Sequence, residues 1–453
     1  MLNKYIGDKK FYLLVLTIAI PMMIQQLVTS SVNLIDNLMV GQLGDFAISG
    51  VASVNRFYLI ATFGTNGLLA ACTIYLSQFY GAKNKSKMQE TLSFAMIFTM
   101  LFVTVFFLLA LFFPKQIVTF FTDDKNVIDV GVKYLNIAKY TYFPLAISFS
   151  IAASFRAIGK AKYPMYIGII AVLINTFMNY CLIFGNFNFP KLEVEGAAYA
   201  TLIARSVEAI LYLLILKYVD VPFKRRIKDI FKISNSIIKS ITLKALPLCT
   251  NEILWSFGMA MLFKFYGTRG SVVMTGYSMA STTADIFFVL FSGMAVSSNV
   301  LISQHLGANE ISKAKDNAYK LLGFCAMMSV FFGFGLFMSS YFVPNLYVVS
   351  TQSKEVASYI LKVMGMMFWV YMLTTQIYFI FRSGGDTKST FIMDSMFMIF
   401  VNLPIVALVT YGTDFSIIGL YLCGQATDFF KLMFASYLLR KENWLNNLAV
   451  EHV

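Results

Sequence analysis

Residues 88–113 read MQETLSFAMIFTMLFVTVFFLLALFF, with Glu90 near the start as the single charged residue. An α-helix rises 1.5 Å per residue, so about 20 apolar residues cross the roughly 30 Å hydrocarbon core of a bilayer. Similar apolar stretches recur along the whole chain. The hydropathy pattern therefore predicts an integral membrane protein.

The composition supports this class. The 453 residues are 58% hydrophobic and 13% charged, with a mean hydropathy of +0.70. A soluble domain cannot bury so much apolar side chain. We predict an all-α integral membrane protein of about twelve transmembrane helices. Their approximate spans are 11–39, 46–79, 88–113, 127–156, 162–185, 195–218, 240–266, 272–305, 313–343, 353–382, 388–411 and 415–440.

The net charge of +13 is distributed asymmetrically. When the segments are followed in order, basic residues gather on one side of the membrane, from Lys4 to Lys441, and few lie on the other. Positive residues stay in the cytoplasm, so both termini are expected to be cytoplasmic. The apolar run after MLNKYIGDKK is too long for a signal peptide and is the first helix. We expect a multi-pass protein of a bacterial cytoplasmic membrane, with no nucleic-acid partner.

The five cysteines lie singly in apolar segments, without CxxC spacing. They indicate neither a disulfide framework nor a zinc site. The sequence also lacks the HExxH, GxSxG and P-loop motifs. We therefore expect no cofactor and no enzymatic activity.

Residues 219–239 form the longest connection and mark the midpoint of the chain. Apolar residues recur there at helical spacing opposite Lys and Arg. This pattern is typical of an amphipathic helix on the inner leaflet, and equally of an ordered linker with solvated charges. The expected domains are an N-terminal lobe (1–218), this cytoplasmic linker (219–239) and a C-terminal lobe (240–453).

The second half repeats the first at a fixed offset. Pro21 matches Pro247, an offset of 247 − 21 = 226, and glycines together with the string Ser-Gln-x-x-Gly-Ala match at the same offset. Each half has about six helices, so both halves insert in the same orientation. We expect two lobes related by pseudo-two-fold symmetry along the membrane normal, with a cavity between them. This architecture indicates a secondary transporter.

Polar residues inside the membrane need an explanation, because a charge there costs roughly 2.5–3.5 kcal/mol on insertion scales. Asp36 lies one turn after Asn33, Asn175 and Asn179 are one turn apart, and Thr201 lies in the next segment. A carboxylate among amide and hydroxyl oxygens can hold a proton or a dehydrated Na⁺. The alternative is a buried hydrogen-bond network that joins helices.

Glu252 follows Pro247 in the C-terminal half, at the position matched by Gln26. An acid beside Asn251, on a helix facing the cavity, is a candidate ligand for a cationic substrate.

Other charged residues are weaker candidates. Three acids could each pair with a Lys or Arg of a neighbouring helix: Asp285, Asp394 and Asp428. Three basic residues lie near expected helix ends, where snorkelling explains them: Arg205, Lys264 and Lys431.

Six strings in order resemble the multidrug and toxic compound extrusion (MATE) family, of the multidrug/oligosaccharidyl-lipid/polysaccharide flippase superfamily. They are DNLMVGQLGDFAISG (36–50), SQFYGAKN (77–84), FRAIGKAKYP (155–164), GAAYAT (196–201), SQHLGANE (303–310) and FRSGGDTKST (381–390). The resemblance covers nearly the whole chain. It implies a twelve-helix exporter with two lobes that alternates access by rocking. It also implies efflux of organic cations or amphipathic compounds against inward H⁺ or Na⁺ flow.

The resemblance places the N-lobe cation site of the family on Asp36, Asn175, Asn179 and Thr201. Some members have Asp where this chain has Asn179, so one of two acids is missing and proton coupling is favoured over Na⁺. The resemblance also suggests that the first helix bends at Pro21.

Glu252 resembles the acid that other members carry in segment 7. Those members also have an Asp three residues before a Gln in segment 10, whereas here Gln376 is present and Leu373 replaces the acid. The residues expected to bind substrate or change conformation are Pro21, Gln26, Asn33, Glu252 and Gln376.

We expect small-molecule drugs or organic cations as substrates, the lipid bilayer as surroundings, and a monomer. The alternative within transport is a lipid-linked saccharide flippase, whose cavity would hold a diphosphate with Arg and Lys. A membrane receptor or enzyme is a further alternative, although a receptor would not need two equivalent halves.

Overall fold

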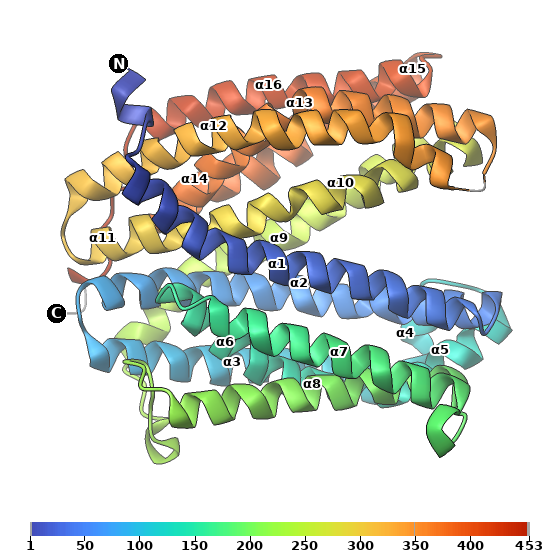
Figure 1. The fold of residues 1–453 in the computed structure, drawn as a ribbon, viewed down its shortest axis with the longest axis horizontal. Coiled ribbons are helices and arrows are strands. Elements are labelled where there is room, and N and C mark those ends of the chain that lie inside the picture. Colours follow the sequence, from blue (N-terminus) through green and yellow to red (C-terminus); the bar gives the residue numbers. More distant parts are fainter. Residues whose placement is uncertain (1, 348, 451–453) are drawn as a thin grey trace. The chain divides into compact units, whose positions relative to one another are not determined.

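The computed structural model describes residues 2–347 and 349–450, without the side chains of residues 2, 3, 32–34, 37, 45 and 227. Over these residues the chain is helical and contains no strand (Figure 1). The predicted all-α class is therefore confirmed.

The helices of the first half follow the expected segments closely. Asn84 caps the third long helix by accepting a hydrogen bond from the backbone N–H of Lys87 at 3.1 Å. The elements are η1 (Leu2–Tyr5), α1 (Lys9–Gly41), α2 (Asp45–Gly81), α3 (Lys85–Phe112), α4 (Pro114–Thr119), α5 (Lys125–Ala138), η2 (Lys139–Thr141), α6 (Tyr142–Ala157), α7 (Lys162–Phe184), η3 (Asn186–Asn188) and α8 (Glu193–Tyr218).

The second half differs from the first in having three π-helical turns, η5, η7 and η8. The elements are η4 (Ile227–Asp229), α9 (Asn235–Gly267), α10 (Ser271–Ser298), η5 (Asn299–Ser303), α11 (Gln304–Gly307), α12 (Ile311–Phe342), η6 (Val343–Leu346), α13 (Thr351–Ser383), α14 (Thr387–Phe391), η7 (Ile392–Met396), η8 (Met398–Asn402), α15 (Leu403–Gly412) and α16 (Ile417–Arg440).

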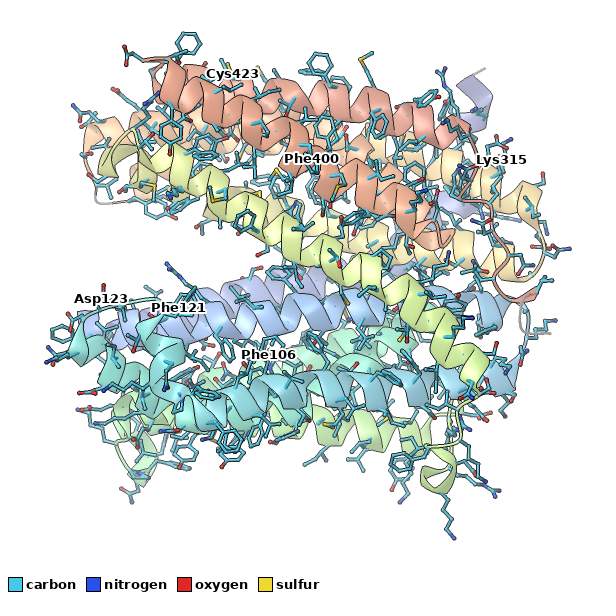
Figure 2. All side chains as sticks on the ribbon, turned by 180° about the vertical axis from the view of Figure 1, so that it is seen from behind. Phe106, Phe121, Asp123, Lys315, Phe400 and Cys423 are labelled. Atoms are coloured by element: carbon cyan, nitrogen blue, oxygen red, sulfur yellow. The ribbon has the colours of Figure 1, made fainter. Side chains whose placement is uncertain are left out.

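Ten of the described helical stretches are long and apolar enough to cross a membrane. The other two expected spans correspond to α5, η2 and α6, where a 3₁₀ turn divides the stretch, and to α16. Large apolar side chains project outward along the helices (Figure 2). On α3, for example, Leu101, Val105 and Phe112 are exposed, as expected of a surface that faces lipid tails. The chain is a multi-pass membrane protein.

The segment 219–239 is not one amphipathic helix but mostly an irregular connection. Only the short η4 turn and the start of α9 are helical in this segment. Its backbone is attached to α3, where Glu90 accepts a hydrogen bond from the N–H of Ser234 at 3.0 Å. Phe223 is fully buried. These tertiary contacts hold the linker in place.

The chain divides into two compact units. Residues 24–249 form one, here called the N-unit. Residues 2–23 and 250–450 form the other, the C-unit. Relative to the expected lobes, the first residues of α1 group with the second half, and the first residues of α9 group with the first half. The middle of each of these two helices is thus where the chain passes from one unit to the other.

Two glycines explain how these exchanged segments pack. A Cβ atom at Gly67 would lie 2.6 Å from Cys249 Cα, and one at Gly293 would lie 2.9 Å from Ala19 Cβ. Neither position has room for a side chain, so the helices approach closely, as small residues permit in membranes. Gly67 and Gly293 are one repeat apart (67 + 226 = 293).

The repeat also appears in side-chain hydrogen bonds. Ser77 Oγ donates to the carbonyl of Ala157 at 2.8 Å, and Ser303 Oγ donates to the carbonyl of Ser383 at 2.7 Å. Both members of the second pair lie 226 residues after those of the first. The two halves therefore share their packing as well as their glycines.

Matched turns have the same backbone conformation. Gly44 and Gly270 have φ of 101° and 103°, and Gly159 and Gly385 have φ of 77° and 75°. These positive values favour glycine. The glycine pattern in the sequence therefore reports the turns between helices.

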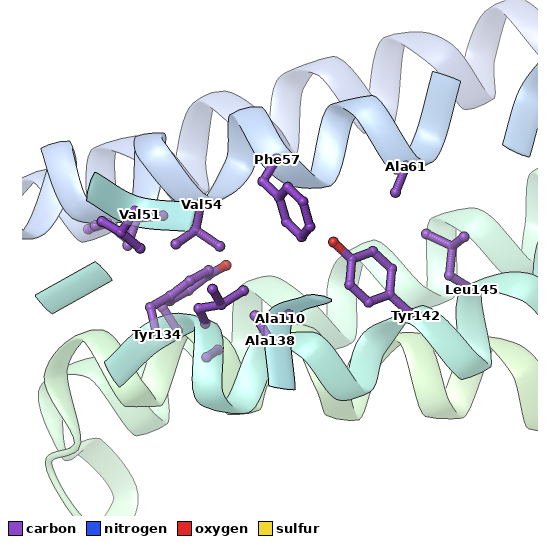
Figure 3. Close-up of a cluster of buried hydrophobic side chains, with 14 of the residues drawn as sticks. Val51, Val54, Phe57, Ala61, Ala110, Tyr134, Ala138, Tyr142 and Leu145 are labelled. Atoms are coloured by element: carbon purple, nitrogen blue, oxygen red, sulfur yellow. The ribbon is translucent and has the colours of Figure 1, made fainter. Parts of the chain in front are cut away.

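An apolar core of the N-unit lies between α2, α5 and α6 (Figure 3). Phe57, Tyr142 and Leu145 are buried there. The rings of Tyr58 and Tyr142 stack with centroids 5.5 Å apart. This core holds α2 against the helices that follow it in the chain.

Candidate functional site

Asp36 of α1 and Asn179 of α7 meet inside the N-unit. The amide nitrogen of Asn179 donates to Asp36 Oδ1 at 2.7 Å. Asn175 and Asn179 are four residues apart on α7 and share one helix face, which is the face turned towards Asp36. The sequence grouping of these residues is therefore matched by their positions.

The side-chain amide of Asn175 lies between Asp36 and Thr201. One of its terminal atoms is 2.7 Å from Asp36 Oδ2 and 3.1 Å from Oδ1, and the other is 3.5 Å from Thr201 Oγ1. The carboxylate only accepts hydrogen bonds, so the nitrogen belongs on its side. Both oxygens of Asp36 thus accept hydrogen bonds from neutral amides.

Asn179 retains a polar atom without a partner. Its Oδ1 is buried and accepts no hydrogen bond from the described residues, while the side chain is 2% exposed. An unpartnered acceptor in an apolar setting costs about 1–3 kcal/mol. Next to Asp36, such an acceptor provides a place for a donor or a cation.

A salt bridge also lies in the N-unit. Arg205 Nη1 is 2.8 Å from Glu208 Oε2, one turn along α8. The snorkelling expected for Arg205 is therefore wrong, because the guanidinium pairs within the helix instead of extending to the membrane surface. Tyr134 of α5 interacts with both Asp36 and Thr201. Sequence reasoning missed Tyr134, which no local pattern singles out.

Glu252 of α9 has a basic neighbour in the C-unit. Arg382 Nη1, at the end of α13, lies 3.8 Å from Glu252 Oε1. Both side chains are partly exposed, at 27% for Arg382 and 21% for Glu252. Glu252 is thus half of an ion pair, and its role as a substrate ligand stays a prediction.

Among the described residues of the C-unit, Asp394 of η7 forms the most buried ion pair. Lys431 Nζ of α16 is 2.8 Å from Asp394 Oδ1, and the two side chains are 17% and 15% exposed. The expected pairing of Asp394 is confirmed. The expected snorkelling of Lys431 is wrong, because its ammonium points to a carboxylate of a neighbouring helix.

Asn251 holds Asp394 from the other side. Its amide nitrogen donates to Asp394 Oδ2 at 3.1 Å, and its carbonyl oxygen Oδ1 accepts from Ser395 Oγ at 2.6 Å. Asn251 is 1% exposed. The sequence did hold a signal for this residue, because the 226 offset matches Asn251 with Gln25, a second amide.

Gln376 lies in a different environment from Glu252. Its amide nitrogen donates to Ser298 Oγ at 2.8 Å, and its oxygen lies 3.4 Å from Cys325 Sγ. These contacts join α13 to α10 and α12. A role of Gln376 in substrate binding stays a prediction.

The structure gives no clear role to the residues of α1 that were predicted to bind substrate or change conformation. Pro21 is buried inside a helix that continues through it, and Gln26 is exposed. The neighbouring Gln25 faces α7, where a Cβ at Gly168 would lie 3.0 Å from its amide nitrogen. The side chain of Asn33 lies outside the described residues. Roles for these residues in transport stay predictions.

Asp428 and Asp285 have no hydrogen bond or ion pair with the described residues. Asp285 of α10 is exposed, and Asp428 of α16 is partly buried. Asp428 interacts electrostatically with Lys431 and Asp394. Among the described residues, no three His, Cys, Asp or Glu side chains are placed to hold a metal ion.

Known proteins resemble this chain over most of its length. It is 23% identical over 410 residues to "Probable multidrug resistance protein YoeA" of Bacillus subtilis, covering 89% of this chain and 88% of that protein. It is 23% identical over 395 residues to "Probable multidrug resistance protein NorM" of Halalkalibacterium halodurans, covering 86% of each.

Solved structures share the fold. One is an outward-facing multidrug resistance MATE family transporter, with a TM-score of 0.86, 17% identity and coverage of 97% of this chain and 98% of that chain. Another is a superfamily transporter from Pyrococcus furiosus with a binding pocket of reverse polarity, with a TM-score of 0.87, 17% identity and coverage of 97% of each chain.

The family model named MatE matches the chain twice, at residues 21–181 and 247–408. The two matches begin 247 − 21 = 226 residues apart, the offset found in the sequence. The all-helical fold, the repeat and the chain's relatives agree, and the chain belongs to the MatE family of membrane transporters.

Proposed function

We propose that this protein is a secondary active multidrug efflux antiporter that exports organic cations or amphipathic compounds in exchange for H⁺. Its relatives carry the name multidrug resistance protein, which supports efflux of drug-like compounds. The observation that carries the coupling is Asp36, a membrane-embedded carboxylate hydrogen-bonded at 2.7 Å to Asn179. Intramembrane carboxylates of this kind mark ion and proton pathways.

The hydrogen bonds around Asp36 favour a proton over Na⁺. Two amide nitrogens point towards the carboxylate, whereas a bound Na⁺ requires oxygens at that place. Protonation gives one oxygen of the carboxyl an O–H group that can donate. The unpartnered Oδ1 of Asn179 then provides an acceptor after a simple rotation of the amide. Na⁺ coupling would need both amides to turn around.

Coupling requires only that the ion and the drug prefer different states of the carrier. In the proposed cycle an outward-open state binds H⁺ at Asp36, rearranges α1 and lowers the affinity for drug. The carrier then turns inward, releases the proton and binds drug again. We propose a monomer with both termini in the cytoplasm and with no cofactor besides the coupling ion.

The arrangement of basic residues disfavours a lipid-linked saccharide flippase. Such a carrier would need Arg or Lys free to hold a diphosphate. Two intramembrane basic residues, Arg205 and Lys431, have acidic partners at 2.8 Å, and Arg382 at the end of α13 lies 3.8 Å from Glu252. These three basic residues are therefore not free to hold a phosphate.

The test is transport of ethidium by the purified protein in proteoliposomes, with pH and Na⁺ gradients imposed separately. A pH gradient alone is expected to drive ethidium against its concentration gradient. Protein-free liposomes and the Asp36→Asn variant serve as controls. Transport that responds to neither gradient would overturn antiport. Transport driven only by a Na⁺ gradient would show that Na⁺, and not H⁺, is the coupling ion.

A further inference from the structure

Five ionisable side chains form a connected group in the C-unit, here called the charge cluster. Two ion pairs flank Asn251, which donates a hydrogen bond to one acid at 3.1 Å and precedes the other in the chain. In one pair Lys431 Nζ lies 2.8 Å from Asp394 Oδ1, and in the other Arg382 Nη1 lies 3.8 Å from Glu252 Oε1. The cluster consists of Glu252 on α9, Arg382 on α13, Asp394 on η7, and Asp428 and Lys431 on α16.

The charge cluster carries an unbalanced negative charge. With all members ionised, two basic and three acidic side chains give 2 − 3 = −1. A charge withheld from water is unfavourable unless another charge neutralises it. The cluster therefore has the charge that one monovalent cation would balance.

Lys431 has two acids nearby and pairs with one of them. Its Nζ lies 2.8 Å from Asp394 Oδ1. Asp428 is three residues earlier on the same helix, on the same face. It interacts electrostatically with Lys431 but forms no hydrogen bond or ion pair with the described residues. A rotation of the Lys431 side chain would thus exchange one carboxylate for the other.

Three tyrosines lie within electrostatic range of Asp428, the acid that Lys431 leaves unpaired. Tyr266, Tyr371 and Tyr421 all interact with Asp428. The rings of Tyr266 and Tyr421 are 5.7 Å apart. Faces of aromatic rings attract cations, in particular weakly hydrated organic ones.

We propose that Asp394 is the binding carboxylate for a monovalent organic cation and that Lys431 occupies it as an internal counter-ion in the absence of substrate. The substrate displaces the ammonium, which moves to Asp428, and the cluster becomes electrically neutral. The inference rests on the proposed export of organic cations. It adds a binding residue on η7, an exchange partner on α16, and a reason for the preference for a single positive charge.

The N-unit supports this division by contrast. Among the described residues, Asp36 accepts hydrogen bonds from the neutral amides of Asn179 and Asn175, at 2.7 Å each. No described ammonium group pairs with Asp36, so a proton can bind there without displacing a charged side chain. An organic cation that binds at Asp394 must displace Lys431, which makes that site responsive to the charge of the substrate.

The experiment measures binding of tetraphenylphosphonium, a permanent monovalent cation, to the full-length protein in nanodiscs by calorimetry at fixed pH and salt. Lys431→Met is expected to bind it about tenfold more tightly, because the competing ammonium is gone. Asp394→Asn is expected to bind about tenfold more weakly. Asp428→Asn is expected to weaken binding, because Lys431 loses its alternative partner. Asp285→Asn, a matched acid outside the cluster, leaves the affinity unchanged.

Removal of Lys431 leaves a carboxylate unpaired and can prevent folding. The double variant Asp394→Asn/Lys431→Met removes both charges and is expected to bind as weakly as Asp394→Asn alone. Wild-type affinity in either of these variants overturns the inference, as does unchanged affinity in a folded Lys431→Met protein. If those results occur while the wild type still exports ethidium, the proposed function stands and only the inference falls. If the wild type neither binds the cation nor exports ethidium, both fall.

Discussion

The N-unit and the C-unit share a scaffold and differ in how they hold an intramembrane carboxylate. In the N-unit, Asp36 is held by two neutral amides. In the C-unit, Asp394 is held by one amide at 3.1 Å and one ammonium at 2.8 Å. The difference shows that a repeat can preserve its packing while its two halves acquire different charge chemistry.

The two carboxylates also occupy different positions of the repeat. Asp36 matches Leu262, and Asp394 matches Gly168 (394 − 226 = 168), which faces Gln25. Asn251 matches Gln25 (251 − 226 = 25). The contact between the first and fifth helices of each half is therefore amide to glycine in the N-unit and amide to carboxylate in the C-unit.

A π-helical turn explains a shift in register between the halves. The second MatE match is one residue longer than the first, since 408 − 247 = 161 and 181 − 21 = 160. A π-turn accommodates such an extra residue within a helix. In η8, Asn402 donates to Thr427 Oγ1 at 2.6 Å, and it lies 402 − 175 = 227 residues after Asn175. With one extra residue in the second half, Asn402 takes the place in the C-unit that Asn175 takes in the N-unit.

The largest effect is expected from Asp36. Asp36→Asn should abolish proton-driven ethidium transport, because an amide can neither bind nor release the coupled proton. The loss should exceed about a hundredfold in rate, the order expected when a positioned proton-transfer group is removed. Transport is measured in proteoliposomes, with Asp285→Asn as the control. Normal coupled transport by a folded Asp36→Asn protein would remove the functional contrast between the two carboxylates.

Lys431→Met should reduce stability strongly, by about 3–5 kcal/mol, because it leaves the partly buried Asp394 without its partner. The double variant Asp394→Asn/Lys431→Met should regain much of this. Thermal unfolding in detergent measures both. Lys313→Met is the control, because Lys313 pairs with Glu310 at 2.7 Å but is 65% exposed, and such pairs contribute about 0–1 kcal/mol. Equal effects at Lys431 and Lys313 would contradict the structural role of the C-unit pair.

Gly67→Ala and Gly293→Ala should destabilise the protein by similar amounts, about 1–3 kcal/mol each. Each added Cβ would meet a helix of the same unit at less than 3.0 Å. Gly412→Ala is the control, because nothing lies within 4 Å of its Cβ position. Unfolding temperatures measure the three variants. A large difference between Gly67→Ala and Gly293→Ala would show that the exchanged segments are not equivalent in the two units.

The smallest effect is expected from Thr201→Val. Its contact with Asn175 is long, at 3.5 Å, and its hydroxyl also donates to its own helix at Ala197. The loss should be less than about 1 kcal/mol, or less than about fivefold in apparent ion affinity. The pH dependence of ethidium transport measures it. A large loss would make Thr201 a direct ligand of the ion and would sharpen the difference from the C-unit.

Much of the candidate site could be predicted before the structure was available. The one-turn spacing of Asn175 and Asn179 indicated a polar face, and Asp36 required partners because of its place in an apolar segment. The partners of Asp394 and Lys431 could not be predicted. They lie 37 residues apart on different helices, and no local period relates them.

The linker shows where local pattern fails. Apolar residues at helical spacing over 219–239 suited an amphipathic helix and an ordered linker equally. In the structure, Glu90 of α3 accepts a hydrogen bond from the N–H of Ser234 at 3.0 Å. A short amphipathic helix is marginal without tertiary support. Here the available contacts supported another conformation.

By itself the sequence determined the class, the helices, the repeat and the first carboxylate of interest. Hydropathy, glycine spacing and one-turn polar pairs are local properties, and a bilayer leaves a long apolar segment little choice but a helix. Only the tertiary structure decided which charges are paired and which segments of α1 and α9 belong to which unit. Both depend on contacts between helices that are distant in sequence, such as the ion pair between Lys431 and Asp394.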